Sequence, residues 1–237
     1  MRSRPVKRLF RMDHSFDSDT LAQRGFAVAS RLLSPAACRE LAALWPQQAL
    51  FRKHIVMQRH GYGQGEYQYF TYPLPEPVAR LREALYPPLA EVANRWNETL
   101  GIPKRFPPTL KGWLKQCHDG GQKRPTPLLL RYRAGDYNCL HRDLYGELVF
   151  PLQVTVLLSA PGKEFEGGEF MLVEQRPRMQ SRGEVVPLGQ GDAVVFAVNE
   201  RPNKGTRGWH RTAMRHGISS LRSGERFTLG LIFHDAA

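Results

Sequence analysis

The chain has 237 residues, of which 41% are hydrophobic, and its formal net charge is +12 with a pI near 10.0. The hydrophobic content supports a folded core, and the length fits one large domain or two small ones. Such a basic excess indicates a polyanionic partner, above all nucleic acid, with a merely basic surface as the alternative.

The sequence shows no membrane or export signal. No apolar run reaches the roughly 18 residues that a membrane span needs, and no signal-peptide core follows the basic N-terminus. Cys38, Cys117 and Cys139 form neither a disulfide pattern nor a zinc pattern. We therefore expect a cytoplasmic protein without membrane contact.

Residues 1–16 are expected to form a basic N-terminal arm. Its cations are Arg2, Arg4, Lys7, Arg8 and Arg11. Such an arm either contacts phosphates or is a frayed tail, and the composition supports both equally.

Residues 17–127 are expected to be a helical and mixed part that packs on a catalytic core. A short helix followed by a strand is predicted over residues 17–33, and Ser34-Pro35 is a typical helix start. Farther along, apolar residues at helical spacing predict two helices, with Pro87-Pro88 as the break between them.

Residues 50–74 interleave glycines, cations and aromatic residues. Such a stretch suits a substrate lid, in which aromatic rings stack on bases and cations contact phosphates. The favoured interpretation is a β-hairpin whose Tyr and Phe side chains pack on the core, because aromatic residues are common in strands.

Residues 128–145, LLLRYRAGDYNCLHRDLY, contain a His-x-Asp at the end of an apolar strand. Side chains i and i+2 of a strand point the same way, so His141 and Asp143 can bind one metal ion from one side. A third ligand must come from elsewhere, and His210 and His216 lie downstream. Two His and one carboxylate form the facial triad of non-haem Fe(II) oxygenases, in which positions stay open for other ligands.

The rest of the chain predicts short strands with Gly-containing turns, which suits a jelly roll. After His216, a predicted strand carries Arg226, whose guanidinium is suited to a bidentate ion pair with a dicarboxylate. Residues 201–215 are expected to be a loop close to the metal. Its cations are Arg201, Lys204, Arg207, Arg211 and Arg215.

Together these features resemble the Fe(II)/2-oxoglutarate-dependent dioxygenase superfamily. The matching pieces are Tyr132 ahead of Gly135, His141-x-Asp143, Gly167-Gly168-Glu169-Phe170, Gly191-Asp192-Ala193-Val194-Val195-Phe196, His216 and Arg226. The resemblance implies an α+β fold. Its catalytic core would be a double-stranded β-helix, or jelly roll, over residues 128–237, with N-terminal supporting helices.

The resemblance also implies roles for these residues. Fe(II) would bind His141, Asp143 and His216. His216 is favoured over His210 because an Arg lies ten residues after the former and Ser220 lies ten residues after the latter.

The cosubstrate 2-oxoglutarate would chelate the iron and place its far carboxylate on Arg226, with Tyr132 hydrogen-bonded to it. Reaction with O2 would give succinate, CO2 and a hydroxylated substrate. His210 and Trp209 would instead line the pocket or stack against the substrate.

Local similarity to the AlkB-like demethylases, in Arg131-Tyr132 and His216-Gly217-Ile218, implies oxidative demethylation of alkylated DNA or RNA. The whole chain resembles a bacterial group of these oxygenases whose expected substrate is damaged DNA. Two AlkB-like residues differ, because Leu130 stands in place of an Asn and Ile232 in place of an Arg. The pocket is thus nearer the prolyl-hydroxylase arrangement, and the alternative is a prolyl or other protein side-chain hydroxylase.

Overall fold

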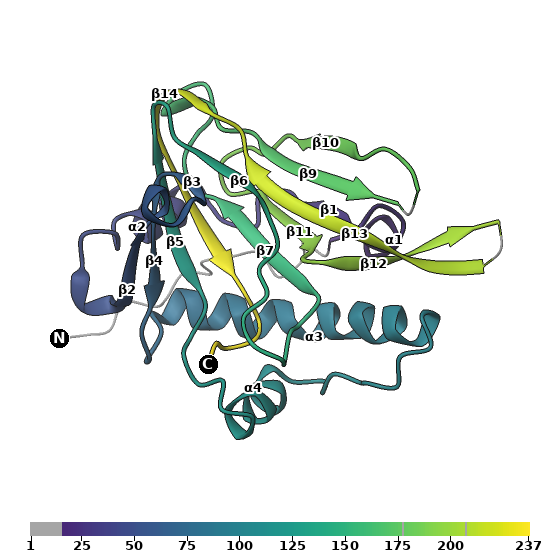
Figure 1. Cartoon of the computed structure of the whole chain (residues 1–237). Coiled ribbons are helices and arrows are strands. Elements are labelled where there is room, and N and C mark those ends of the chain that lie inside the picture. Colours follow the sequence, from purple (N-terminus) through teal and green to yellow (C-terminus); the bar gives the residue numbers. More distant parts are fainter. Residues whose placement is uncertain (1–15, 177, 207) are drawn as a thin grey trace.

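The structure is a computed structural model that describes residues 16–176, 178–206 and 208–237. Its centre is a pair of β-sheets, and a long helix runs alongside them (Figure 1). The cations of the expected N-terminal arm lie outside the described residues.

The larger sheet has eight strands. In spatial order they are β1 (Phe26–Ala29), β11 (Ala193–Ala197), β7 (Leu152–Leu157), β14 (Leu221–Leu231), β5 (Leu128–Arg133), β4 (Glu66–Phe70) and β2 (Phe51–Val56), with β8 (Phe165–Gly167) paired to β14. The smaller sheet has six: β10 (Arg182–Val186), β9 (Phe170–Gln175), β13 (Gly208–Ile218), β6 (Tyr137–His141) and β3 (Gly63–Gln64), with β12 (Glu200–Gly205) paired to β13. All pairs are antiparallel, and the two sheets form the predicted double-stranded β-helix.

The described residues also form four α-helices. They are α1 (Ser18–Arg24), α2 (Pro35–Ala42), α3 (Glu76–Thr99) and α4 (Leu110–Asp119), and short 3-10 turns cover Gln48–Leu50 and Met57–His60. The predicted helix start at Ser34 is confirmed, because its side chain accepts a hydrogen bond from a backbone N–H group of α2, and Asp17 caps α1 in the same way. The helix α4 was not predicted from the sequence.

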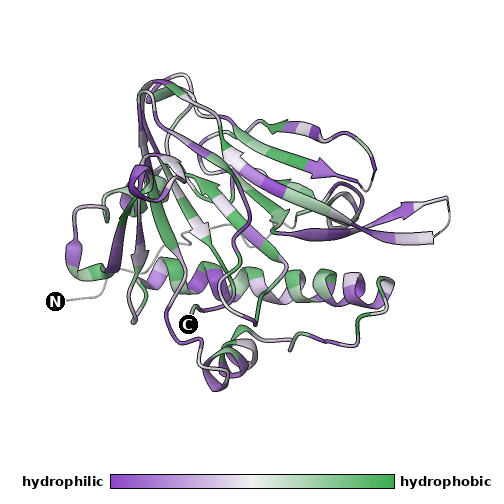
Figure 2. Cartoon of the chain, in the orientation of Figure 1, coloured by the Kyte–Doolittle hydropathy of each residue, from purple (hydrophilic) through white to green (hydrophobic). Residues whose placement is uncertain are grey.

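The predicted helix break at Pro87-Pro88 is wrong, because α3 continues through both prolines. Each proline removes a backbone donor and costs about 3 kcal/mol in a helix interior. One buried stripe lies on both sides of the prolines and compensates for this cost through packing. Its members include Val78, Leu81, Leu85, Leu89, Val92 and Trp96. In Figure 2, hydrophobic and hydrophilic segments alternate along the ribbon of α3.

The N-terminal part of the chain contributes strands as well as helices. β2 and β4 pair as the predicted hairpin, and β4 joins β5 in the larger sheet, while β1 pairs with β11. The larger of two clusters of buried hydrophobic side chains among the described residues extends in sequence from Phe16 to Phe233. Among the described residues, no helix is long and apolar enough to cross a membrane.

Residues 201–215 do not form the predicted loop, and the closeness of their charge to the metal stays a prediction. This segment forms a regular hairpin of β12 and β13, with Glu200 paired to Ala213 and Gly205 to Gly208. The hairpin projects beyond the sheets, so most of its charge lies away from the core (Figure 1).

The helix α3 anchors the C-terminal segment through Arg82. Its guanidinium, which is 1% exposed, donates to the carbonyl of Ile232 and to Asp235 Oδ1, both at 2.9 Å. Tyr72 donates to Asp235 Oδ2 at 2.9 Å, and His118 Nε2 lies 2.8 Å from the same oxygen. Because Ile232 directly follows β14, this network fixes the end of that strand.

Replacement Arg82→Ala should lower the free energy of unfolding by about 3–5 kcal/mol, because Asp235 would stay buried without its counter-charge. Urea denaturation measures this change. The control Lys115→Ala breaks an ion pair with Asp119 whose side chains are 75% and 64% exposed, and should cost less than about 1 kcal/mol. Equal, small effects of the two changes would contradict the anchoring role.

Candidate metal centre and cosubstrate pocket

Two histidines from distant parts of the chain lie opposite each other in the smaller sheet. His141 ends β6, His216 lies near the end of β13, and antiparallel pairing places them directly in register. The next pair is Ile218 with Asn138, so β6 holds one extra residue in between, as in a β-bulge. The two imidazole rings lie 4.2 Å apart between centroids.

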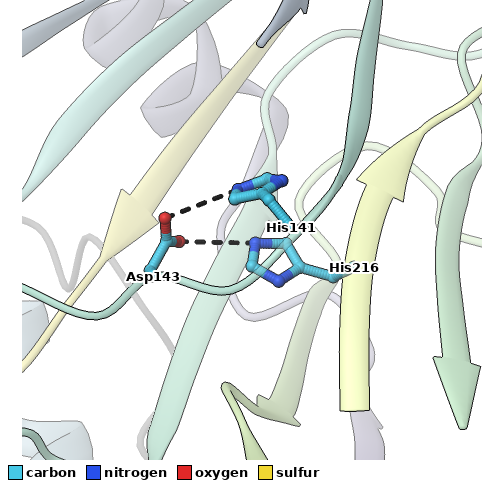
Figure 3. A group of neighbouring side chains, drawn as sticks. All are labelled: His141, Asp143 and His216. Atoms are coloured by element: carbon cyan, nitrogen blue, oxygen red, sulfur yellow. Dashed lines mark ion pairs between the residues drawn. The ribbon is translucent and has the colours of Figure 1, made fainter. Parts of the chain in front are cut away.

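Asp143 completes the cluster two residues beyond β6. Its carboxylate oxygens lie 3.4 Å from Nε2 of His141 and 3.3 Å from Nε2 of His216 (Figure 3). One possible ligand atom from each residue lies within 4.8 Å of the others. Within residues 16–176, 178–206 and 208–237, this is the only such group of three or more His, Cys, Asp or Glu.

Hydrogen bonds orient two of these side chains. Nδ1 of His141 lies 2.7 Å from the carbonyl oxygen of Cys139, so it carries the ring proton and leaves Nε2 free. The hydroxyl of Tyr145 donates to Asp143 Oδ1 at 2.8 Å, and Tyr69 donates to the hydroxyl oxygen of Tyr145 at 3.1 Å. The carboxylate is thereby held at one oxygen, while the other remains available.

The pKa shifts of Asp143 and His216 favour the forms that bind metal, whereas the shift of His141 does not. Burial acts to raise the pKa of Asp143, but hydrogen bonds and charge from the two histidines hold it well below its usual range. Burial, assisted by the charge of His141, lowers the pKa of His216. Burial opposes protonation of His141 too, but the hydrogen bond and charge of Asp143 raise its pKa. An ionised carboxylate and a neutral imidazole are the forms that bind metal.

The cluster lies in the wall of a cavity of about 430 Å³. Its lining combines apolar side chains, Leu130, Phe170 and Ile218, with polar ones, Gln153, Thr155 and Thr228. Exposed apolar side chains surround the opening: Tyr62 is 50% exposed, Leu140 41% and Leu144 48%. Tyr62 belongs to the turn between β2 and β4, so the predicted hairpin contributes to the opening of the cavity.

Arg226 and Tyr132 are cross-strand partners on β14 and β5. Arg226 is 1% exposed, and its Nε and Nη1 atoms have no hydrogen-bond partner. Burial lowers the pKa of Arg226 to about 10, so the group stays charged at neutral pH. Its guanidinium lies 5.6 Å from the ring centroid of Tyr132. Arg226 borders a second cavity, of about 410 Å³, and Phe170 lines both cavities.

His210 does not join the cluster. It pairs with Asn203 in the projecting hairpin, and neither His210 nor Trp209 lines the cavity. Of the two roles expected for these residues, lining the pocket is therefore wrong, and stacking against a substrate stays a prediction. The cause is that six residues of extended chain in β13 separate His210 from His216.

A family model described as "Oxygenase, catalysing oxidative methylation of damaged DNA" matches residues 65–236. The chain belongs to this oxygenase family. "Uncharacterized protein Rv2227" of Mycobacterium tuberculosis (strain ATCC 25618 / H37Rv) is 52% identical over 168 residues, which are 71% of this chain and 72% of that protein. "Uncharacterized protein MT2286" of strain CDC 1551 / Oshkosh matches to the same extent.

Solved structures show the same fold for this oxygenase. A Pseudomonas putida prolyl-4-hydroxylase has a TM-score of 0.53 and 16% identity, and the match covers 93% of this chain and 97% of that chain. An oxidoreductase of the 2OG-Fe(II) oxygenase family from Burkholderia pseudomallei has a TM-score of 0.52 and 16% identity, with 93% and 91% covered.

The family model and the fold confirm the oxygenase resemblance seen in the sequence. That resemblance implies Fe(II), 2-oxoglutarate and O2 as cofactors. The residues fit these cofactors, because a His–Asp–His set suits Fe(II) and a buried cation without a partner suits a carboxylate.

Sequence reasoning missed several residues of the site. Tyr145 follows Asp143 by two positions, but only the fold turns its hydroxyl back onto the carboxylate. Gln153 and Thr155 give the cavity part of its polar lining, but they lie in β7, whose sequence predicts only a buried strand. Leu130 lines the cavity, whereas Ile232 packs in a separate hydrophobic cluster with Ile55 and Leu128.

Proposed function

We propose that this oxygenase hydroxylates an alkyl C–H bond on a damaged base of DNA or RNA, so that an N-methyl group is released as formaldehyde. The observation that carries the proposal is the His–Asp–His cluster in the wall of an open cavity, in a chain whose family is described as acting on damaged DNA. The net charge of +12 supports a polyanionic substrate.

In this proposal His141, Asp143 and His216 hold Fe(II) and leave positions open for 2-oxoglutarate and O2. Hydrogen bonds to ligands commonly fix their orientation, and Tyr145 would serve Asp143 in this way. His216 has no hydrogen bond at Nδ1, so packing against aromatic rings orients it instead. These rings belong to Phe196, 4.6 Å away between centroids, and to Phe170, 6.2 Å away.

Arg226 would bind the far carboxylate of 2-oxoglutarate. A buried guanidinium with two atoms unpaired is costly unless an anion joins it, and a carboxylate supplies a charge-assisted, bidentate partner. Tyr132 is fully buried beside Arg226, and its hydroxyl lies 3.4 Å from Asn138 Nδ2 and is suited to donate to the cosubstrate.

When bound, iron and 2-oxoglutarate activate O2 for C–H hydroxylation, with succinate and CO2 as coproducts. The chain itself positions the reactants and excludes water. The apolar walls at Leu130, Phe170 and Ile218 limit solvent near the cluster. At the opening, Tyr62 and Leu144 offer apolar surface to a base that leaves its stack.

A protein side-chain hydroxylase is the second candidate. The observation that favours it is the apolar replacement at two AlkB-like positions, because Leu130 adds no polar group to the cavity and Ile232 lies outside its lining. Arg226 is then the buried basic residue offered to the far carboxylate of the cosubstrate, as in the prolyl-hydroxylase arrangement.

Loss of His216 should abolish tight metal binding, whereas loss of His210 should not. We expect His216→Ala to weaken Fe(II) affinity by more than about 100-fold. Changing a residue that only hydrogen-bonds to a metal ligand weakens metal affinity by up to about 100-fold. His210→Ala should bind iron as the unaltered chain does, because it lies in the projecting hairpin. Anaerobic titration with Fe(II) measures both, and the reverse result would exchange the two assignments.

Replacement Arg226→Ala should raise the Kd for 2-oxoglutarate about 10- to 100-fold, the effect of losing a charged hydrogen-bond partner. Arg226→Lys should be intermediate, because it keeps the charge but loses the planar fork. Calorimetric titration of 2-oxoglutarate into the iron-loaded protein under nitrogen tests both. Unchanged affinity in both variants, with intact iron binding, would remove Arg226 from the cosubstrate site.

The Tyr145 hydroxyl should matter for metal affinity. Tyr145→Phe removes the donor to Asp143 and should weaken Fe(II) binding about 10- to 100-fold. Tyr62→Phe is the matched control, because Tyr62 also lines the cavity but makes no hydrogen bond to Asp143, Tyr145 or Tyr69. Equal iron affinities of the two variants would show that Asp143 needs no support from Tyr145.

The decisive test of substrate class is product release by the iron-loaded protein. Succinate and formaldehyde are measured with methylated single-stranded DNA, methylated duplex DNA, methylated RNA and no nucleic acid. Formaldehyde that depends on both nucleic acid and 2-oxoglutarate is the expected result. Succinate release that responds to proline-containing peptides, without formaldehyde from any nucleic acid, would favour the protein hydroxylase instead.

A further inference from the structure

The β12/β13 hairpin carries a row of side chains on the solvent side of the smaller sheet. Strand alternation places Arg215, Arg211 and Trp209 on the face opposite to His216, and all three are exposed. Lys204 lies opposite Trp209 in register and is also exposed. At about 3.3 Å per residue, the row extends about 20 Å along β13 from the neighbour of His216.

Little negative charge opposes this row. Arg211 pairs with Glu200 at 3.6 Å, but the two side chains are 56% and 41% exposed, so the pair is weak. Within the part of the chain that the structure describes, Lys204 and Arg215 have no acidic partner. Arg201 differs from the row, because it points inward, is 3% exposed and pairs with Glu174.

The inner end of the row lies on the outer face of the smaller sheet. Arg215 precedes His216 in β13 and points away from the cavity that His216 lines. Arg142, which follows His141, lines the cavity itself. Cationic side chains therefore lie on both sides of this part of the sheet, and those of the outer face continue onto the projecting hairpin, whose β12 strand is mostly hydrophilic in Figure 2.

Trp209 adds an aromatic surface at the outer end of the row. Its side chain is 53% exposed, and among the described residues no ring stacks on it and no cation lies over it. An exposed indole beside spaced cations suits an unpaired base and its phosphates, because stacking is available to any base that is not already stacked in a duplex.

We propose that this row, Lys204, Trp209, Arg211 and Arg215, docks the backbone of a single nucleic-acid strand on the outer face of the smaller sheet. The inference rests on the proposed nucleic-acid substrate and names the surface that holds the strand. The cations contact phosphates, and Trp209 stacks on one unpaired base.

The test compares two double variants of equal net charge. Lys204→Gln/Arg215→Gln alters the row, and Lys111→Gln/Lys123→Gln alters exposed lysines on and after α4, away from the hairpin (Figure 1). Binding of a fluorescein-labelled, unmodified single-stranded oligonucleotide is measured by anisotropy between about 50 and about 200 mM salt. Iron affinity and 2-oxoglutarate affinity should be the same in both variants.

We expect the plot of log K against log salt to become shallower by about 1.4 in the row variant, at about 0.7 per phosphate contact in a single strand. The control variant should keep the slope of the unaltered chain. Trp209→Ala should weaken binding about tenfold at every salt concentration without a change of slope, because stacking releases no counterions.

If the unaltered chain binds the oligonucleotide and the row variant has the same slope of log K against log salt, the docking row is overturned and the substrate proposal stands. Absence of oligonucleotide binding by the unaltered chain, together with peptide-dependent succinate release, would overturn both. Equal affinity for duplex DNA, with the same loss in Trp209→Ala, would overturn the single-strand assignment.

Discussion

The site depends on the register between β6 and β13. Antiparallel pairing of His141 with His216 brings together two residues that are far apart in the chain. A register shift of one residue in either strand would turn the imidazole of that strand to the other face of the sheet. The bulge between this pair and the pair of Asn138 and Ile218 adjusts where the short strand β6 ends. Asp143 then lies just beyond that end, close enough to face both rings.

A second constraint is the buried charge of Arg226. Among the residues that the structure describes, no group hydrogen-bonds to its Nε and Nη1 atoms, and an unpaired buried cation destabilises the fold. Its aliphatic stem packs closely, because a Cβ at Gly168 would lie 3.0 Å from Cδ of Arg226 and would overlap Leu221. The positive φ of Gly168 gives a second reason for glycine there. The glycine-containing turn before β9 thus shapes the position of the cation.

One strand serves two surfaces. In β13 the residues on one face, including Met214 and His216, are buried, and those on the other face, including Arg211 and Arg215, are exposed. The two-residue period of a strand therefore lets a single element supply a candidate metal ligand inside and a cationic row outside. The smaller sheet can do this because its outer face stays exposed, whereas α3 lies along the larger sheet (Figure 1).

The sequence by itself determined the candidate residues of the site. The signals are local spacings in the sequence: His141-x-Asp143, a later His, and Arg226 ten residues after His216. Short strands with glycine turns likewise indicate a jelly roll before any long-range contact is known. Tertiary structure alone decided which histidine meets the carboxylate, since sheet register acts between residues that are remote in sequence. It also kept α3 whole through Pro87-Pro88, because a buried stripe outweighs two lost backbone donors. For the same reason Tyr145 could not be assigned from the sequence: its hydrogen bond to Asp143 depends on how the chain turns after β6, and no propensity or period encodes that turn.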